Sequence, residues 1–305
     1  MTSSPPINAE WHALDRPHAT VEYCRWADPS SSAGPGPRGV VVIAHGACEH
    51  AARYGRFASL LVEDGLVVYG LDHRGHGRTA DRHGTFGVAR PGGWRAMVDD
   101  VVALATRAGE AHPDVPVVLF GHSMGSLLAQ RVMQIDGDRY AGVVLSGTSG
   151  GLEGAAEVVA MLGAIEADEG AEVPSAMFAG IFAGFNERFA GESPDPTGFE
   201  WLSRDADEVR RYHEDPWCGG DLSNGFVTDM IAGMAEMWSG GAEEAIPDGL
   251  PILLIAGDAD PVGDDGESVR ALATRYEALG KGPLTVVLYP GARHEVLNET
   301  NRDEV

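Results

Sequence analysis

One serine of the chain stands in a setting that could make it a nucleophile. An apolar run, Val117–Phe120, leads into Gly121–Gly125, which reads Gly-His-Ser-Met-Gly, and a helix-like run follows. In a tight turn between a strand and a helix, the residues two before and two after the serine must be small, as Gly121 and Gly125 are. Because such a turn lifts the serine hydroxyl above the sheet, the motif predicts Ser123 as a catalytic nucleophile.

A nucleophilic serine needs a base to remove its proton, and the base needs an acid to fix its tautomer. Two later apolar runs end in loops that carry suitable side chains. Leu253–Gly257 is followed by Asp258 and Asp260, and Val286–Tyr289 is followed by a loop with His294. The chain has eleven histidines, and its position after the last strand singles out His294 as the base. The residues alone leave the acid open between the two aspartates.

Acyl transfer also needs hydrogen-bond donors for the oxyanion that forms on the carbonyl. One donor should be the N–H of Met124, immediately after Ser123, and the other should come from the loop after an early strand. That loop is 45–50, which reads His-Gly-Ala-Cys-Glu-His. We expect the N–H of Ala47 to be the second donor and His45 to brace the loop.

The elements that would position these residues are short apolar runs separated by helix-like stretches. Trp94–Ala108 and Ser268–Leu279 show the spacing of helices that cover a sheet. Strands that are apolar on both faces belong to a covered sheet, so the pattern predicts a mostly parallel, doubly wound α/β sheet. Val21–Trp26 is expected to be an antiparallel edge strand, and Ser30–Pro37 a turn. The other predicted strands are Gly39–Ala44, Leu66–Leu71, Val115–Phe120, Ala141–Leu145, Leu250–Ala256 and Leu284–Tyr289.

The alternation stops after Leu145 and resumes only at Leu250. About a hundred residues intervene, whereas connections in such sheets usually take a handful. We expect 149–248 to form a helical cap, or lid, inserted into a core made of 1–148 and 249–305. The segment is rich in Met and aromatic side chains, most of which should form its own small core. Some of them could also wall an acyl pocket.

Composition excludes several classes of partner. The formal charge is −24, from 46 acidic and 22 basic residues, which disfavours nucleic acid and anionic membranes. No apolar stretch is long enough for a stable membrane insertion, and residues 1–12 lack the features of a secretion signal. Cys24, Cys48 and Cys218 lie far apart and form no CxxC pair, so we expect reduced thiols in a cytoplasmic protein. The sequence predicts neither a metal nor a cofactor.

Two other classes of function compete with a serine hydrolase. A ligand receptor on the same scaffold is disfavoured, because it would not need the serine, the acid and the histidine together. A metallohydrolase is disfavoured because it leaves the turn around Ser123 unexplained. Its ligands would come from a group of histidines and an acid early in the chain: His45, His50, Asp72, His73 and His76.

Five runs support a more specific interpretation. They are HGACEHAARY, DHRGHGRT at Asp72–Thr79, GHSMG, GDADPVGD and YPGARHEVLNE. Together they resemble the monoglyceride lipases and lysophospholipase-like serine hydrolases of the α/β-hydrolase superfamily. The resemblance spans most of the sheet domain and is weak in the cap. It implies the α/β-hydrolase fold and an acid three residues beyond the glycine that ends its strand, which is Asp260.

The resemblance also implies roles around the catalytic group. The oxyanion donors of the family fall on Ala47 and Met124, and the polar residues that line its alcohol side fall on Glu49 and Arg53. One position departs from the animal monoglyceride lipases, because Leu297 stands where they have a second histidine.

The expected activity is cleavage of carboxylic esters through an acyl-enzyme, on monoacylglycerol or lysophospholipid-type lipid esters. Because the chain is strongly negative, neutral monoacylglycerols are preferred over acidic lysolipids. The alternatives are a small-ester carboxylesterase and an acyl thioesterase.

Overall fold

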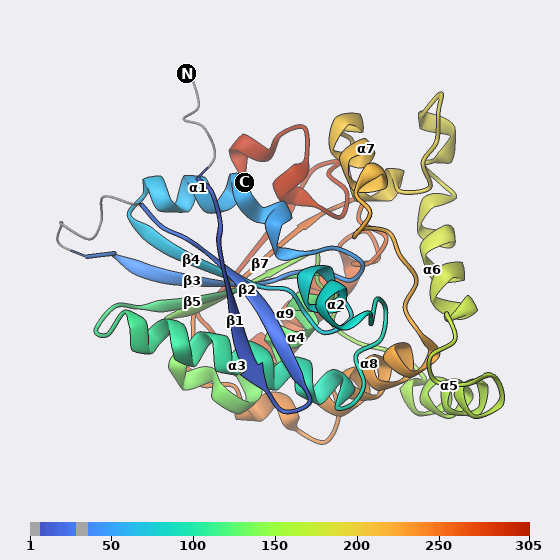
Figure 1. The fold of residues 1–305 in the computed structure, drawn as a ribbon, viewed down its shortest axis with the longest axis horizontal. Helices are drawn as coiled ribbons and strands as arrows, with labels where there is room; N and C mark the ends of the chain where they lie inside the picture. Colours follow the sequence, from blue (N-terminus) through green and yellow to red (C-terminus); the bar gives the residue numbers. More distant parts are fainter. Residues whose placement is uncertain (1–6, 29–35) are drawn as a thin grey trace.

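A single sheet runs through the centre of the computed structural model, which describes residues 7–28 and 36–305 (Figure 1). The strand order is β1-β2-β4-β3-β5-β6-β7-β8. From β4 to β8 all neighbouring strands are parallel, while β1 and β2 pair antiparallel with each other and β2 pairs antiparallel with β4. The predicted mostly parallel sheet is therefore confirmed. The strands are β1 (Glu10–Arg16), β2 (Ala19–Trp26), β3 (Gly39–Ala44), β4 (Leu66–Leu71), β5 (Val117–His122), β6 (Gly142–Ser146), β7 (Ile252–Gly257) and β8 (Leu284–Tyr289).

The predicted edge strand at Val21–Trp26 is antiparallel but does not lie at the edge. It forms most of β2, and β1 pairs along its outer side from Glu10 to Arg16. The sequence of β1 is polar and no residue of it is buried, so it lacks the apolar run by which the other strands are recognised. Residues 30–35 of the expected turn lie outside the described part of the chain.

Helices cover both faces of the sheet. Successive residues of β3 point to opposite sides, so Val40 and Val42 pack into one core with α3, α4 and α9, while Val41 and Ile43 pack into a second core with α1. This explains why the central strands are apolar throughout. The helices of the sheet domain are α1 (Gly55–Glu63), α2 (Gly77–His83), α3 (Gly93–Ala111), α4 (Met124–Asp136) and α9 (Glu267–Ala278).

The strand order reverses at β3, and this positions the site. The chain passes from β3 to β4 on one side, whereas β5 lies on the other side. The ends of β3 and β5 are adjacent, with Ala44 paired to Gly121. In an open α/β sheet, the crevice at such a reversal is the usual place for a ligand. The loop 45–50 and the turn at Ser123 both begin there.

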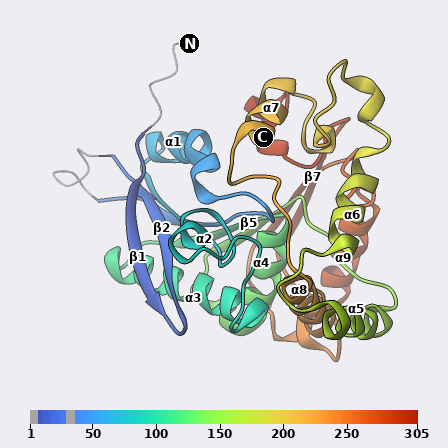
Figure 2. The same cartoon turned by 45° about the vertical axis from the view of Figure 1, so that its right-hand side comes forward.

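The segment between β6 and β7 is largely helical, with α5 (Ala155–Glu169), α6 (Ala176–Asn186), α7 (Ala206–Glu214) and α8 (Asn224–Met237). Figures 1 and 2 show α5 and α6 together on the side of the molecule away from β1. Helix α8 packs against α5 and also directly on α3, where a Cβ at Gly233 would lie 2.1 Å from the Trp94 ring. Among the described residues, no helix is long and apolar enough to cross a membrane.

Candidate active site

The turn between β5 and α4 has the strained geometry that its sequence predicts. Ser123 has a φ of 51° and a ψ of −122°, and α4 begins at the next residue. A Cβ at Gly121 would lie 2.4 Å from the carbonyl oxygen of Gly125, and one at Gly125 would lie 2.0 Å from that of Ala44. Only glycine fits at either position, so the two glycines of the motif are a steric requirement of the turn.

The loops after β7 and β8 bring an acid and a histidine together. His294 Nδ1 lies 2.9 Å from Asp260 Oδ2 and 3.0 Å from Asp260 Oδ1, and both residues are buried. The backbone N–H of Val262 donates to Asp260 Oδ1 at 2.9 Å, which fixes the carboxylate. Asp258 instead accepts a hydrogen bond from the N–H of Gly291 at 2.6 Å. Of the two aspartates left open by the residues, the structure therefore places Asp260 on the histidine.

The carboxylate changes the proton affinity of the ring. Burial by itself lowers the pKa of His294, but the adjacent Asp260 outweighs burial and raises that pKa above its usual value. Because a carboxylate accepts the Nδ1–H, the second ring nitrogen, Nε2, is left free to accept a proton. A ring in this state suits a general base for a serine hydroxyl.

Ser123 and His294 line one small cavity. Its volume is about 10 Å³, which is room for roughly one water molecule. The side chains from the segment between β6 and β7 that close it are Phe182, Trp201, Leu202 and Tyr212. These side chains therefore leave little room over the serine, which is only partly buried.

One of these contacts also reaches the histidine. The ring of Trp201 lies 4.9 Å from that of His294, and the N–H of Glu295 donates to the carbonyl of Leu202 at 2.8 Å. Both Trp201 and Leu202 belong to a short 3-10 turn, Glu200–Leu202. No local motif marks these residues, so sequence reasoning did not find them.

The loop 45–50 borders the same cavity through Gly46 and Ala47. Its shape is held by the Glu49 carboxylate, which accepts from the N–H of Gly46 at 2.6 Å. His45 braces the loop as expected: its Nδ1 donates to the Gly46 carbonyl at 2.7 Å and its Nε2 accepts from the backbone N–H of residue 73 at 3.0 Å. Met124 follows Ser123 and opens α4, where the first backbone N–H groups of a helix have no carbonyl of an earlier turn to bind.

Comparison with known proteins identifies the family. The model of the family described as serine aminopeptidase, S33, matches residues 35–301. The chain belongs to this family of serine hydrolases. A monoacylglycerol lipase of Mycolicibacterium smegmatis is 30% identical over 267 residues, which cover 86% of this chain and 83% of that protein. The resemblance to monoglyceride lipases is thus confirmed.

Solved structures agree with the fold of this S33 hydrolase. A carboxyl esterase from Bacillus coagulans in complex with glycerol has a TM-score of 0.86 at 30% identity, covering 99% of this chain and 96% of that chain. A lipase described as an open form has a TM-score of 0.81 at 29% identity, covering 97% and 95%. The expected α/β-hydrolase fold is confirmed by these likenesses.

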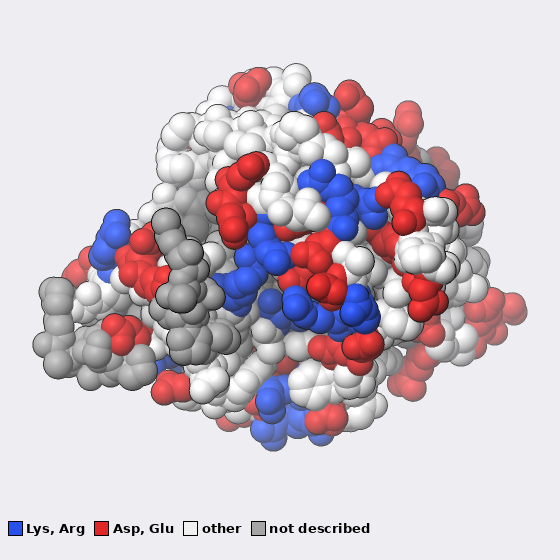
Figure 3. Space-filling model, turned by 90° about the horizontal axis from the view of Figure 1, so that it is seen from above, with Lys and Arg blue, Asp and Glu red and all other residues white. Residues whose placement is uncertain are grey.

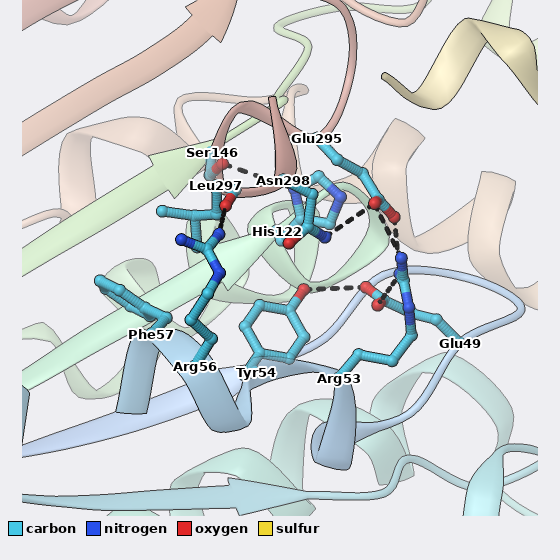
Figure 4. A pocket seen from close by; sticks show the side chains of 10 residues that line it. All are labelled: Glu49, Arg53, Tyr54, Arg56, Phe57, His122, Ser146, Glu295, Leu297 and Asn298. Carbon is cyan, nitrogen blue, oxygen red and sulfur yellow. Dashed lines mark hydrogen bonds and ion pairs between the residues drawn. The ribbon is translucent and has the colours of Figure 1, made fainter. Parts of the chain in front are cut away.

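The hydrolase buries a cluster of three charged side chains, two of which, Glu49 and Glu295, also line the serine cavity (Figure 4). Arg53 Nη1 lies 2.6 Å from Glu49 Oε2 and 2.6 Å from Glu295 Oε1, and Arg53 Nη2 lies 2.8 Å from Glu295 Oε2. Burial alone would raise the pKa of Glu295, but Arg53 holds that pKa at about 2. With Leu297, these residues line a second cavity of about 20 Å³. Sequence analysis named Glu49 and Arg53 but missed Glu295, their partner.

Of the side chains that a metallohydrolase would use, Asp72 and His45 are engaged in bracing the backbone instead. Asp72 accepts hydrogen bonds from the N–H groups of Ala51 at 2.8 Å and Arg78 at 2.7 Å, so it braces the backbone. Within the described ranges, the one group of three His, Cys or acidic side chains close enough to share an ion contains a single member of that set, His50, together with Asp215 and Cys218. Cys48, which follows Ala47, is buried, and burial raises the pKa of its thiol. It is therefore a poor nucleophile.

Buried neutral histidines should make this hydrolase sensitive to acid. Burial lowers the pKa of His73 to about 3 and those of His76 and His122 to about 4, and it also lowers that of His45. In the unfolded chain these histidines bind protons at a pH at which burial keeps them neutral in the folded chain. The free energy of unfolding should therefore fall between about pH 6.5 and pH 4, by up to about 1.4 kcal/mol per pH unit for each histidine.

Urea unfolding at a series of pH values measures this slope. In His73→Leu the slope of the unfolding free energy against pH should decrease by up to about 1.4 kcal/mol per pH unit, which corresponds to one proton. His213→Gln, on the exposed side of α7, should keep the slope of the wild type. Equal slopes in the wild type and His73→Leu would contradict the role of burial.

Proposed function

We propose that this protein hydrolyses carboxylic esters through an acyl-enzyme on Ser123. The observation that carries the proposal is the setting of that serine: it sits at a strained elbow and shares a cavity with His294, whose Nδ1 meets a buried carboxylate. The similarity to a monoacylglycerol lipase and a carboxyl esterase supports an ester as the substrate.

In the first half of the reaction, Ser123 Oγ attacks the ester carbonyl and His294 Nε2 takes the hydroxyl proton. The N–H groups of Ala47 and Met124 stabilise the oxyanion. When the tetrahedral intermediate collapses, the bond to the alcohol breaks, and His294 returns its proton to the departing oxygen. Asp260 stays ionised and stabilises the imidazolium.

In the second half, water replaces the alcohol. His294 takes a proton from the water as its oxygen attacks the acyl carbon, and the same donors hold the second oxyanion. Collapse releases the carboxylic acid and returns the proton to Ser123 Oγ. The alcohol side of the site is proposed to lie toward Glu49 and Arg53. The cavity that these two residues line is also lined by His122 and Glu295, and both of those residues line the serine cavity as well.

We further propose that 149–248 acts as a cap over a core of 1–148 and 249–305. Support comes from Phe182 and Trp201, which close a cavity that has room for about one water molecule. An ester needs more room than this, so we propose that the segment moves when substrate binds.

The proposed substrate is a neutral lipid ester, with monoacylglycerols ahead of lysophospholipids. Apolar side chains face the serine from the cap, and Met161, Val173 and Ile181 of the same segment are exposed. On the face shown in Figure 3, Lys and Arg side chains lie among Asp and Glu side chains, which does not favour an anionic partner. The three cysteines are all free, which fits the reducing cytoplasm, where we place a role in lipid metabolism.

The value of kcat/KM should rise with acyl length in a series of p-nitrophenyl esters from acetyl to palmitoyl. Each methylene that becomes buried contributes up to about 0.8 kcal/mol, or roughly fourfold, until the pocket is full. Phe182→Ala should flatten this dependence because Phe182 lines the pocket. Phe86→Ala, at a side chain that is 48% exposed elsewhere, should leave it unchanged.

A steady fall from acetyl or butyryl onward would instead favour a small-ester carboxylesterase, the second candidate, which the likeness to the Bacillus coagulans esterase supports. Monoacylglycerols, lysophospholipids and acyl thioesters, tested beside the p-nitrophenyl series, separate the remaining alternatives.

A further inference from the structure

We propose that His50, Asp215 and Cys218 form a binding site for a zinc ion that ties the cap to the loop 45–50. One ligand atom from each of the three side chains lies within 4.8 Å of the others. His50 belongs to the loop beside the serine, whereas Asp215 and Cys218 belong to the connection between α7 and α8. Nitrogen, oxygen and sulfur ligands in one group are typical of zinc, and hard cations such as magnesium would not use the thiol.

The backbone already holds the ligands in place. The N–H of Cys218 donates to the Asp215 carbonyl at 3.0 Å, so a tight turn presents both side chains together. The N–H of Trp217 donates to Asp215 Oδ1 at 2.9 Å, while Oδ2 accepts from His50 Nε2 at 2.9 Å. An ion would replace the His50 proton between these two atoms. Oδ1 would remain anchored by the backbone, as ligating carboxylates usually are.

The distances suit a tetrahedral ion after small adjustments. Zinc bonds nitrogen, oxygen and sulfur at about 2.0–2.3 Å, which separates neighbouring ligand atoms by roughly 3.4–3.6 Å. Side-chain rotations that move the ligand atoms by about 1 Å would bring the present group to this spacing. His50 is buried, whereas Asp215 and Cys218 are partly exposed, so an ion can enter from solvent and a water can take the fourth position.

The local charges favour a cation. The positive charge of Arg53 acts on Cys218, but Arg53 is paired with both Glu49 and Glu295, and this cluster carries an excess negative charge. Binding would also convert the Cys218 thiol to a thiolate, since the thiolate is the form that binds metal. Two anionic ligands would then balance the ion.

The position of the site gives it a consequence for catalysis. The carbonyl of Cys48, one residue after the proposed oxyanion donor Ala47, accepts hydrogen bonds from the N–H of Gly219 at 2.9 Å and from Tyr212 Oη at 2.8 Å. These contacts hold α7 and the α7–α8 connection against the loop 45–50. A bound ion would replace the His50–Asp215 hydrogen bond, the third contact between these segments, with metal–ligand bonds and would hold the cap more firmly against the loop 45–50. Zinc should therefore inhibit turnover; this last step rests on the proposed function.

Metal binding is tested without reference to activity. Purified full-length protein should bind one zinc ion per chain in equilibrium dialysis, and cobalt(II) should give a thiolate-to-metal charge-transfer band in the near ultraviolet. Asp215→Asn and Cys218→Ser should each weaken binding at least tenfold, and Cys218→Ser should lose the band.

The matched controls are Asp221→Asn, at an exposed acid of the same connection, and Cys24→Ser, at a cysteine buried in β2. Both variants should bind zinc as the wild type does. Unchanged affinity in Asp215→Asn and Cys218→Ser, or no band in the wild type, would overturn the site.

Inhibition is then measured with the same proteins. Zinc should slow ester turnover of the wild type, EDTA should restore it, and Cys218→Ser should be at least tenfold less sensitive. Equal inhibition of both proteins would place the inhibitory ion elsewhere and refute the tie. If the chain proved not to hydrolyse esters, the dialysis and the cobalt spectrum would still decide the metal site, so the two proposals can fail separately.

Discussion

Replacing Ser123 with alanine should reduce kcat for ester hydrolysis by about 10⁴-fold to 10⁶-fold, because the nucleophile of the acyl-enzyme is lost. The fold should be unaffected. Alanine tolerates the φ of 51° about as well as serine does, and the change removes a single oxygen from a small cavity. Steady-state kinetics with a p-nitrophenyl ester measures the loss, and circular dichroism with urea unfolding checks the fold.

Ser126→Ala is the matched control for this variant. Ser126 lies within the first turn of α4, and its hydroxyl donates to the Ser123 carbonyl at 2.6 Å and lies 2.8 Å from the hydroxyl oxygen of Thr148. Its loss should cost about 1 kcal/mol of stability and leave kcat within about tenfold of the wild type. If Ser123→Ala itself kept turnover within tenfold, which is about 1.4 kcal/mol in the barrier, Ser123 would not be the nucleophile.

Asp260→Asn should reduce kcat by about 10⁴-fold, because an amide at this position favours the wrong tautomer of His294. The acidic limb of the kcat/KM profile should also move to lower pH, since Asp260 is the group that raises the pKa of His294. Asp258→Asn should have a small effect, because the Asp258 carboxylate accepts a hydrogen bond from the backbone N–H of Gly291 rather than from His294.

Full pH–rate profiles of both variants provide the measurement. Circular dichroism must show that each variant is folded, because Asp260 also accepts from the N–H of Val262. A larger loss in Asp258→Asn, or an unmoved acidic limb in Asp260→Asn, would contradict the assignment of the acid.

Much of the sheet and of the catalytic group is encoded locally, and that part could be predicted. The strands at Gly39–Ala44, Leu66–Leu71 and Leu284–Tyr289 have the predicted bounds, because each is an apolar run with clear turn residues nearby. The elbow is predictable for a different reason. Its glycines are required by contacts with atoms only a few residues away or on the adjacent strand, so a short pattern carries the geometry.

Other features depend on partners far apart in the sequence. Glu295 is matched to Arg53, which lies 242 residues earlier, and nothing beside Glu295 indicates that its charge is neutralised. The contact of Trp201 with the ring of His294 likewise depends on how the cap docks. A local pattern of residue types cannot predict such pairings, because the free-energy cost of burying a charge or an indole depends on which groups the folded chain brings next to it.

The central claim is that Ser123 is acylated during turnover, and labelling with a fluorophosphonate tests it most directly. Mass spectrometry of the intact protein should show one adduct per chain, and peptide mapping should place it on Ser123. A long-chain ester should slow the labelling by competition. An adduct on another residue, or no adduct on a protein that still hydrolyses esters, would contradict the account.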